Sequence, residues 1–411
     1  MLLKGNCLEL LAEMPDNSVD SIVTDPPYEL GFMGKSWDNS GIAYSVELWS
    51  QALRVLKPGG HLLAFGGSRT YHRLPSAVED AGFEIRDQIM WLYGSGFPKS
   101  LDVSKAIDKA AGAERPDRIV ETHGKSGSHE NPTRHVTNAG TPSTHEAQQW
   151  QGWGTALKPA HEPIVVARKP LIGTVAANVL TYGTGALNID GSRVGTGTGE
   201  TKTVQYPNIR GNNYNNAEGT VEYIVTDQGR WPANVIHDGS EEVLEGFPIT
   251  GSARPARTGR AGGSNSERSL GMTADHIGTW PADTGGSAAR FFYCAKASKS
   301  ERNAGLEGLP EKPGGSNAKG YTQDVANGLD RNRPVANFHP TVKPIALMRY
   351  LVKLVTPPNG TVLDPFLGSG TTAVAAILEG FNWMGCEMTE DYWPIIEARV
   401  AWAEAQPKTL L

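Results

Sequence analysis

The chain of 411 residues lacks the features that mark several protein classes. Its three cysteines, Cys7, Cys294 and Cys386, show no Cys-x-x-Cys spacing, which argues against a disulfide framework and a cysteine zinc site and suits a reducing cytosol. No apolar run approaches the ~18 residues that span a bilayer. The first residues also become acidic too early for a signal peptide. We therefore expect a cytoplasmic protein with no membrane partner.

An excess of positive charge is also missing. Lys and Arg number 38 against 44 Asp and Glu, a net charge of −6, which excludes a wholly basic nucleic-acid coat but not a local basic patch. The ten histidines have no metal-ligand spacing such as His-Glu-x-x-His, so we expect no metal site. Glycine and proline are abundant, at 48 and 27 residues or about 18% together against about 12% on average. This excess predicts a globular scaffold with long irregular stretches.

Two zones of the chain alternate between strand and helix patterns. In the N-terminal zone we expect strands at 21–24, 61–65 and 83–92, and helices at 46–56 and 71–81, with 57–60 ending the first helix. In the C-terminal zone we expect helices at 345–355, 371–379 and 391–405, and strands at 361–364 and 382–387. This alternation predicts an α/β fold with a doubly wound, mostly parallel sheet. The C-terminal zone is too small to fold well alone, so it should complete the N-terminal sheet.

The middle of the chain is different in composition. Residues 171–330 hold 26 of the 48 glycines and include runs without periodicity at 195–199 and 210–216. Short strand-like pieces occur at 162–167, 221–225 and 290–295. We expect a loop-rich insertion in the sheet.

A glycine-rich loop, DPFLGSGTT at 364–372, lies between a predicted strand and a predicted helix. Its glycines let the backbone approach a ligand, and the helix N-terminus offers free amide groups. Glu387 follows the next strand, where an acidic side chain can accept hydrogen bonds from ribose hydroxyls. The loop also fits the looser G-x-G-x-x-G/A pattern, so a nicotinamide or flavin site and a turn without ligand remain alternatives. The candidate cofactor-binding residues are Asp364, Phe366, Gly368, Ser369, Gly370, Thr371 and Glu387.

A second motif, Asp25-Pro26-Pro27-Tyr28, follows another predicted strand, at the end where ligands bind in open α/β sheets. The two prolines stiffen the turn and remove two backbone donors, which leaves carbonyl oxygens as acceptors. A carboxylate, a fixed carbonyl and an aromatic ring suit a planar group with an exocyclic amine. The alternative is a turn in which Asp25 caps a loop and Tyr28 packs.

Together the two motifs resemble those of the S-adenosylmethionine-dependent DNA amino-methyltransferases, which methylate adenine N6 or cytosine N4. The chain carries their DPPY at 25–28, their F-x-G-x-G loop at 366–370, and supporting segments such as HPTVKP at 339–344. With the catalytic motif first, the order resembles the β group, a circular permutation of a Rossmann-like seven-stranded sheet with one reversed strand. HEPIVVARKP at 161–170 is similar to the last core strand. The resemblance implies a catalytic half at 1–170, a target-recognition insertion at 171–335 and a cofactor half at 336–411.

The resemblance also implies roles for single residues. The target base is flipped out of the DNA; Tyr28 stacks on it, while Asp25 and the Pro26 carbonyl accept hydrogen bonds from its amine. Asn6 stands where the family usually has an Asp on the adenine side of the cofactor. Phe366 packs over the cofactor or serves as a core aromatic. Lys343 borders the methionine end of the cofactor or is a solvated lysine before a helix.

DNA recognition is expected in the variable middle. Residues 251–302 hold eight Lys and Arg against four acids, a balance that suits phosphate contacts and guanine recognition, although a solvated loop surface is the alternative. The DNA-binding candidates are Lys35, Arg254, Arg257, Arg260 and Arg268. Double-stranded DNA is the implied partner, in a bacterial or phage-infected cell. The family also allows a homodimer and a partner restriction endonuclease.

The leading interpretation is an adenine-N6 DNA methyltransferase, because cytosine-N4 enzymes of this family more often have Ser at the position of Asp25. A cytosine-N4 methyltransferase is the first alternative. A dinucleotide-dependent oxidoreductase would use the loop at 364–372 but leaves 25–28 and 339–344 unexplained. A catalytically silent DNA-binding protein is the last alternative, and the intact Asp25 and Tyr28 argue against it.

Overall fold

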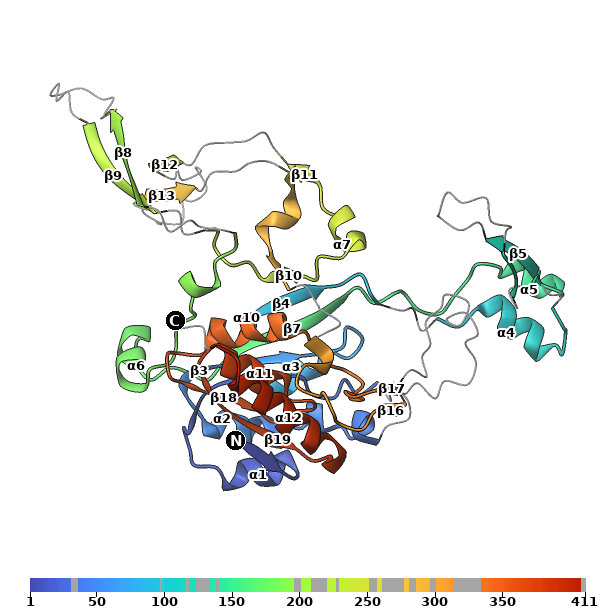
Figure 1. Ribbon diagram of the computed structural model, residues 1–411, viewed down its shortest axis with the longest axis horizontal. Helices are drawn as coiled ribbons and strands as arrows, with labels where there is room; N and C mark the ends of the chain where they lie inside the picture. Colours follow the sequence, from blue (N-terminus) through green and yellow to red (C-terminus); the bar gives the residue numbers. More distant parts are fainter. Residues whose placement is uncertain are drawn as a thin grey trace.

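A nine-stranded sheet forms the centre of the computed structural model, in the order β1-β19-β18-β2-β3-β7-β4-β10-β15 (Figure 1). The structure describes residues 1–30, 36–96, 98, 100–115, 118–122, 133–137, 140–195, 201–207, 220–226, 229–250, 257–260, 277–280, 286–295, 301–313 and 334–407. Neighbouring strands are parallel except at β7, which runs antiparallel to β3 and β4. The strands are β1 (Leu2–Lys4), β2 (Val19–Thr24), β3 (Leu56–Phe65), β4 (Glu84–Leu92), β7 (His161–Arg168), β10 (Val235–His237), β15 (Tyr293–Cys294), β18 (Thr361–Asp364) and β19 (Asn382–Glu387).

Helices cover both faces of this sheet. Successive side chains of a strand point to opposite faces, and in β2 the buried Ile22 belongs to one core cluster and Val23 to the other. The first cluster includes side chains of α1, α2 and α3, whereas the second includes those of α10 and α11. Burial on both faces explains why the strands read as continuous apolar runs. The helices are α1 (Cys7–Glu13), α2 (Val46–Val55), α3 (Arg73–Asp80), α10 (Ile345–Val355), α11 (Thr371–Leu378) and α12 (Trp393–Glu404).

The two ends of the chain meet inside the sheet. β18 lies beside β2, with Val362 opposite Ser21 and Leu363 opposite Ile22. From this pair the chain continues outward in both directions, through α11 to β19 and through α2 to β3. Ligands of open α/β sheets bind at such a reversal of strand order. The C-terminal zone therefore completes the N-terminal sheet, as its small size predicted.

Two strands of the sheet come from the middle of the chain, so the expectation of seven strands was too low. β10 pairs with β4 and β15 pairs with β10, both in parallel. The expected strand at 290–295 is instead a 3-10 helix, Ala288–Phe291, followed by the two-residue β15. The expected turn at 57–60 belongs to β3, because the backbone there pairs with the segment after β7 through Gly59 and Lys169. β10 and β15 are too short to show the alternation of apolar and polar side chains by which a sequence indicates a strand.

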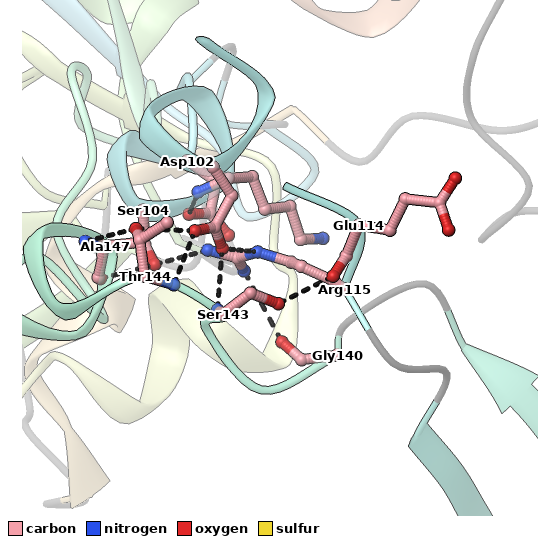
Figure 2. A network of polar contacts seen from close by, with 10 residues as sticks. Asp102, Ser104, Glu114, Arg115, Gly140, Ser143, Thr144 and Ala147 are labelled. Carbon is pink, nitrogen blue, oxygen red and sulfur yellow. Dashed lines mark hydrogen bonds and ion pairs between the residues drawn. The ribbon is translucent and has the colours of Figure 1, made fainter. Parts of the chain in front are cut away.

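A small helical unit projects from the connection between β4 and β7 (Figure 1). It contains α4 (Val103–Ala110) and α5 (His145–Gln149). The carboxylate of Asp108 holds the unit together, because it accepts hydrogen bonds from Arg115 Nε at 2.6 Å and Thr144 Oγ1 at 2.7 Å, and also from the Ser143 amide. Figure 2 labels these three partners. Burial of Asp108 raises its pKa, but these bonds outweigh it and lower the pKa to about 2.

Two chain segments connect this unit to the sheet as a paired arm. The Tyr93 amide donates to the Ala160 carbonyl, and Asp102 forms a bridge with Gly154. A Cβ at Gly96 would overlap the carbonyl oxygen of Pro159, so the close approach of the two segments requires glycine there. The arm therefore leads from the unit directly into the start of β7.

The remaining described elements are short. They include the helices α6 (Val175–Tyr182) and α7 (Glu241–Glu245). Five two-stranded sheets lie outside the central one: β5 (Arg118–Thr122) with β6 (Thr133–Thr137), β8 (Thr201–Pro207) with β9 (Thr220–Thr226), β11 (Ile249–Thr250) with β14 (Gly286–Ser287), β12 (Arg257–Arg260) with β13 (Ile277–Trp280), and β16 (Lys312–Pro313) with β17 (Pro334–Val335). Among the described helices, none is both long and apolar enough to cross a bilayer.

Candidate active site

The turn after β2 carries the predicted catalytic residues. Asp25 follows the last residue of β2 at the carboxyl edge of the sheet, with 17% of its side chain exposed. Its Oδ2 accepts a hydrogen bond from Lys343 Nζ at 2.7 Å. Its Oδ1 is buried and has no hydrogen-bond partner in the part of the chain that the structure describes. A buried acceptor without a partner is costly, so Oδ1 has the capacity for a further hydrogen bond.

Tyr28 is held at both ends. Its hydroxyl donates to Glu162 Oε2 at 2.8 Å, and its carbonyl oxygen accepts from Thr70 Oγ1 at 2.8 Å. A Cβ at Gly67 would lie 3.2 Å from Cδ2 of the Tyr28 ring, so this glycine makes room for the ring. Burial, and then the charges of Asp25 and Glu162, raise the pKa of Tyr28 well above its usual value. The hydroxyl therefore stays protonated and donates.

Lys343 lies among these groups, in the segment before α10. Its Nζ is 2.7 Å from Asp25 Oδ2, 3.1 Å from the Tyr28 hydroxyl and 3.2 Å from Glu162 Oε2. Burial alone would lower the pKa of Lys343, but the two carboxylates outweigh it and raise the pKa, which keeps the ammonium charged. The lysine is buried, so the alternative of a solvated lysine before a helix was wrong.

The glycine-rich loop follows β18, the strand next to β2. Gly368 and Gly370 have φ angles of +57° and +79°, which favour glycine. A Cβ at Gly368 would lie 2.9 Å from His339 Nε2, and one at Gly370 would lie 3.3 Å from Ile396. The loop therefore packs closely against both the 339–344 segment and α12, and it leads into the N-terminus of α11.

Asp364 organises this loop from within. Its Oδ1 accepts hydrogen bonds from Thr24 Oγ1 at 2.6 Å and from the Phe366 amide at 3.0 Å, and its Oδ2 accepts from Thr372 Oγ1 at 2.5 Å. Burial raises the pKa of Asp364 to about 6. Both carboxylate oxygens are thus used inside the protein. Asp364, predicted to bind cofactor, joins the end of β2 to the loop and also lines the cavity described below.

A buried arginine of α12 forms hydrogen bonds with the glycine-rich loop. Arg399 Nη1 donates to the Ser369 carbonyl at 2.6 Å, and lies 3.0 Å from the hydroxyls of both Ser369 and Thr371. Both of these residues were cofactor candidates, and both line the cavity described below. Arg399 was not predicted, because the sequence of α12 has no apolar stripe that shows which of its residues are buried.

The ends of β1 and β19 provide further candidate cofactor contacts. Glu387 Oε2 accepts from the Gly368 amide at 2.8 Å, and its Oε1 accepts from the Thr389 amide at 2.7 Å. Burial raises the pKa of Glu387. Asn6 caps α1, with its side-chain oxygen accepting from the Leu8 amide at 2.9 Å. The caps and turns of these strands therefore hold both side chains beside the glycine loop.

One cavity of about 1330 Å³ joins all these features. Asn6, Phe366 and Glu387 line it on the side of β1 and β19, and Asp25, Tyr28 and Lys343 line it on the side of β2. Ligand pockets usually measure about 300–1,000 Å³, so this cavity has room for two bound groups, one at each side. The structure thus brings the two predicted motifs together in one site.

Part of the cavity wall was not predicted. Residues 155–162, from the arm and the start of β7, line the side of the cavity next to Tyr28, together with Tyr93. Glu162 contributes the acceptor for the Tyr28 hydroxyl. The signal for Glu162 was present in the sequence, since a carboxylate stands directly before the buried run 163–167 of a core strand.

The predicted DNA-binding residues are described only in part. Lys35, Arg254 and Arg268 lie outside the described residues. Arg257 and Arg260 belong to β12, where only their backbone pairing with β13 is described. Two other basic residues of the 251–302 patch bind the protein's own backbone: Arg290 donates to the carbonyls of Gly286 and Ser287, and Arg302 to those of Asn337 and His339.

Comparison with known proteins points to one family. The family model of the N6/N4 DNA methylases, described as a DNA methylase, matches residues 19–398. Type II methyltransferase M.ScaI of Streptomyces caespitosus is 40% identical over 82 residues, 20% of this chain and 27% of that protein. Type II methyltransferase M.HpaI of Haemophilus parainfluenzae is 33% identical over 113 residues, 26% of this chain and 36% of that protein. The chain thus spans well under half the length of these relatives.

The solved structures add only a general likeness of fold. The structure of PvuII DNA methyltransferase (cytosine-N4-specific) aligns with 97% of this chain and 85% of its own, at 14% identity and a TM-score of 0.43. These values are too low to bear on function. The family match does bear on it, because it leaves the dinucleotide-dependent oxidoreductase without support. The matched range contains both the turn at 25–28 and the loop at 364–372, and this chain belongs to the N6/N4 DNA methylase family.

Proposed function

We propose that this chain is a DNA methyltransferase that moves a methyl group from S-adenosylmethionine to the N6 amine of an adenine flipped out of the duplex. The observation that carries the proposal is Oδ1 of Asp25, a buried acceptor without a partner among the described residues. Asp25 lines a cavity that continues to the glycine loop at 364–372. A donor group of the substrate and a ligand on the loop can therefore meet in one site.

The loop side of the cavity fits S-adenosylmethionine. Gly368 lines the cavity, and without a side chain there the backbone of the loop can approach a ligand closely. The Glu387 carboxylate suits the two ribose hydroxyls, and the Phe366 ring and Asn6 line the same side. When bound, the cofactor supplies an electrophilic methyl group on a sulfonium. The roles of Asp364, Ser369 and Thr371 are then to hold the loop in shape.

The other side of the cavity fits a flat base with an exocyclic amine. Asp25 Oδ1 and the Pro26 carbonyl accept the two amine hydrogens, and the Tyr28 ring, fixed through its hydroxyl, stacks on the base. These contacts orient the nitrogen lone pair toward the methyl donor and exclude water. Orientation and a preorganised electrostatic environment account for the acceleration. The cysteines of the chain have no part in this chemistry.

Adenine is the proposed base because Asp, rather than Ser, stands first in the 25–28 motif. Cytosine N4 presents a similar amine and is the alternative. We also propose that the middle of the chain and the α4–α5 unit select the DNA sequence, since the cavity wall at 155–162 continues into the arm of that unit. The substrate is double-stranded DNA.

The test is product analysis. Unmethylated genomic DNA is incubated with the full chain and S-adenosylmethionine, digested to nucleosides and examined by mass spectrometry. We expect N6-methyldeoxyadenosine. N4-methyldeoxycytidine would overturn the choice of adenine, and the absence of both products would overturn the proposed activity.

A matched pair of variants then tests the site. Asp25→Ala should lower the methyl-transfer rate by about a hundredfold or more, as for loss of a transition-state contact, with S-adenosylmethionine affinity little changed. Asp16→Ala, which removes an exposed carboxylate paired with Arg54, should leave the rate unaltered. Near-wild-type turnover of Asp25→Ala would count against the assigned role.

A further inference from the structure

The reversed strand β7 brings an unexpected carboxylate into the site. Because β7 runs against β3 and β4, its first residues lie at the edge where the other strands end. Glu162 is its second residue, opposite Trp91 of β4, and 18% of its side chain is exposed. The following positions of β7, 163–167, are buried. The packing of the sheet does not require a carboxylate at position 162.

Glu162 completes the hydrogen bonds of its neighbours Lys343 and Tyr28. An ammonium group has three donors and no acceptor, and Lys343 Nζ has three partners, at Asp25 Oδ2, Glu162 Oε2 and the Tyr28 hydroxyl. The Tyr28 hydroxyl donates a hydrogen bond to Glu162 Oε2 at 2.8 Å. No donor of Lys343 is left over for Oδ1 of Asp25. Without Glu162, the lysine could turn toward both oxygens of Asp25.

We propose that Glu162 is a positioning residue for methyl transfer, which acts through Lys343 and Tyr28 to keep Oδ1 of Asp25 free for the target amine. This inference rests on the proposed function but not on whether the base is adenine or cytosine. Glu162 also anchors the ring of Tyr28 against the base. Its role in the reaction is to hold Lys343 and Tyr28 in position.

The charges in the site give the proposal a measurable consequence. The charged or titratable groups near Asp25 or its partners include Lys343 and His339 before α10, Glu162 on β7, Tyr28 in the turn, Tyr93 after β4 and Asp364 on β18. Burial raises the pKa of Asp25, Lys343 lowers it, and the negative charge of Glu162 raises it. Asp25 must be ionised to accept the amine. The acid limb of the rate profile therefore reports its pKa.

The experiment is a single-turnover methyl-transfer assay between pH 5 and pH 9 with labelled S-adenosylmethionine and unmethylated DNA. Glu162→Gln removes a like charge, so the pKa of Asp25 should fall and the acid limb should move to lower pH by about one unit. The plateau rate should fall about tenfold, because Lys343 and Tyr28 lose their fixed positions. S-adenosylmethionine affinity should stay within twofold of wild type.

Two further variants separate the effect of charge from the effect of side-chain length. Lys343→Met removes the positive charge, so the acid limb should move to higher pH. Glu162→Asp keeps the negative charge but shortens the reach, so its acid limb should stay near that of wild type while the plateau rate falls. This split between charge and reach would not occur if Glu162 only stabilised the fold.

The matched control is Glu84→Gln. Glu84 pairs with Arg168 at the far end of β7, so the variant removes a carboxylate from the same strand pair outside the cavity and should keep the wild-type profile. An acid limb of Glu162→Gln that coincides with wild type would overturn the inference, whatever its plateau rate. If the wild-type chain methylates no amine at all, the proposed function fails first, and the two failures are distinguishable.

Discussion

At the scale of single residues, Asp364 connects several elements of the site. It receives the hydroxyls of Thr24 and Thr372 and the amide of Phe366, so one carboxylate connects β2, β18 and α11. With its pKa raised to about 6 by burial, it is ionised at neutral pH and can accept all three bonds. These bonds hold the glycine loop in shape.

We expect Asp364→Ala to weaken S-adenosylmethionine binding by about tenfold or more, because three buried donors lose their acceptor at a cost of roughly 1–3 kcal/mol each. Asp364→Asn should retain most of the affinity, because the Thr372 hydroxyl can turn and accept from the amide. Titration calorimetry gives both dissociation constants, and circular dichroism checks the fold. Equal affinities for the two variants would contradict this role.

The residues of the site divide by how much of their role was visible in the sequence. Asp25, Tyr28 and the glycines of the 368–370 turn were predicted, because short-range motifs determine their backbone. Lys343 was predicted in the site, but its contacts with Asp25 and Glu162 were not, and Glu162 and Arg399 were not predicted. Their roles depend on contacts between strands and helices that are distant in sequence. The carboxylate before the buried run 163–167 indicated a polar position, but no local pattern indicated its partners.

At the scale of elements, regular segments were predicted well and short ones poorly. The helix 345–355 and the strands 361–364 and 382–387 have the expected bounds, because each combines a clear apolar pattern with a turn signal at its end. β10 and β15, with three and two residues, have no such pattern. They form because β4 offers an unpaired edge, which is a property of the assembled sheet.

The α4–α5 unit depends on a single buried carboxylate (Figure 2). α5 has five residues, too few for an isolated helix, and Asp108 binds Thr144, which caps it. We expect Asp108→Ala to increase amide hydrogen exchange throughout α4 and α5 while β2 and β18 keep wild-type protection. Lys109→Ala, on the exposed side of α4, is the control. Unchanged exchange in α5 would show that the unit does not need this carboxylate.

At the scale of the whole molecule, the site is built from both ends of the chain. β1 and β2 come from the first residues, β18 and β19 from the last, and the pairing of β18 with β2 places the two motifs side by side. The doubly wound sheet and its completion by the C-terminal zone followed from the alternating pattern. The contribution of the middle of the chain to that sheet did not.

Because both ends line one cavity, a bound cofactor should stabilise the whole sheet. We expect S-adenosylmethionine at a hundred times its dissociation constant to add about 2.7 kcal/mol to the stability of the folded state, visible as a higher midpoint in differential scanning calorimetry. NAD at the same concentration should leave the midpoint unchanged. A stabilising effect of NAD equal to that of S-adenosylmethionine would argue against the proposed cofactor.

The arm between β4 and β7 determines where this protein can tolerate changes of length. Asp102 and Gly154 close the base of the α4–α5 unit, and Glu162 follows eight positions after Gly154. Residues added or removed beyond the Asp102–Gly154 bridge change only the unit. A slip of one residue between Gly154 and β7 would turn the side chain of Glu162 to the opposite face of the sheet. The α4–α5 unit can thus be replaced as a whole, whereas the segment between Gly154 and β7 must keep its length.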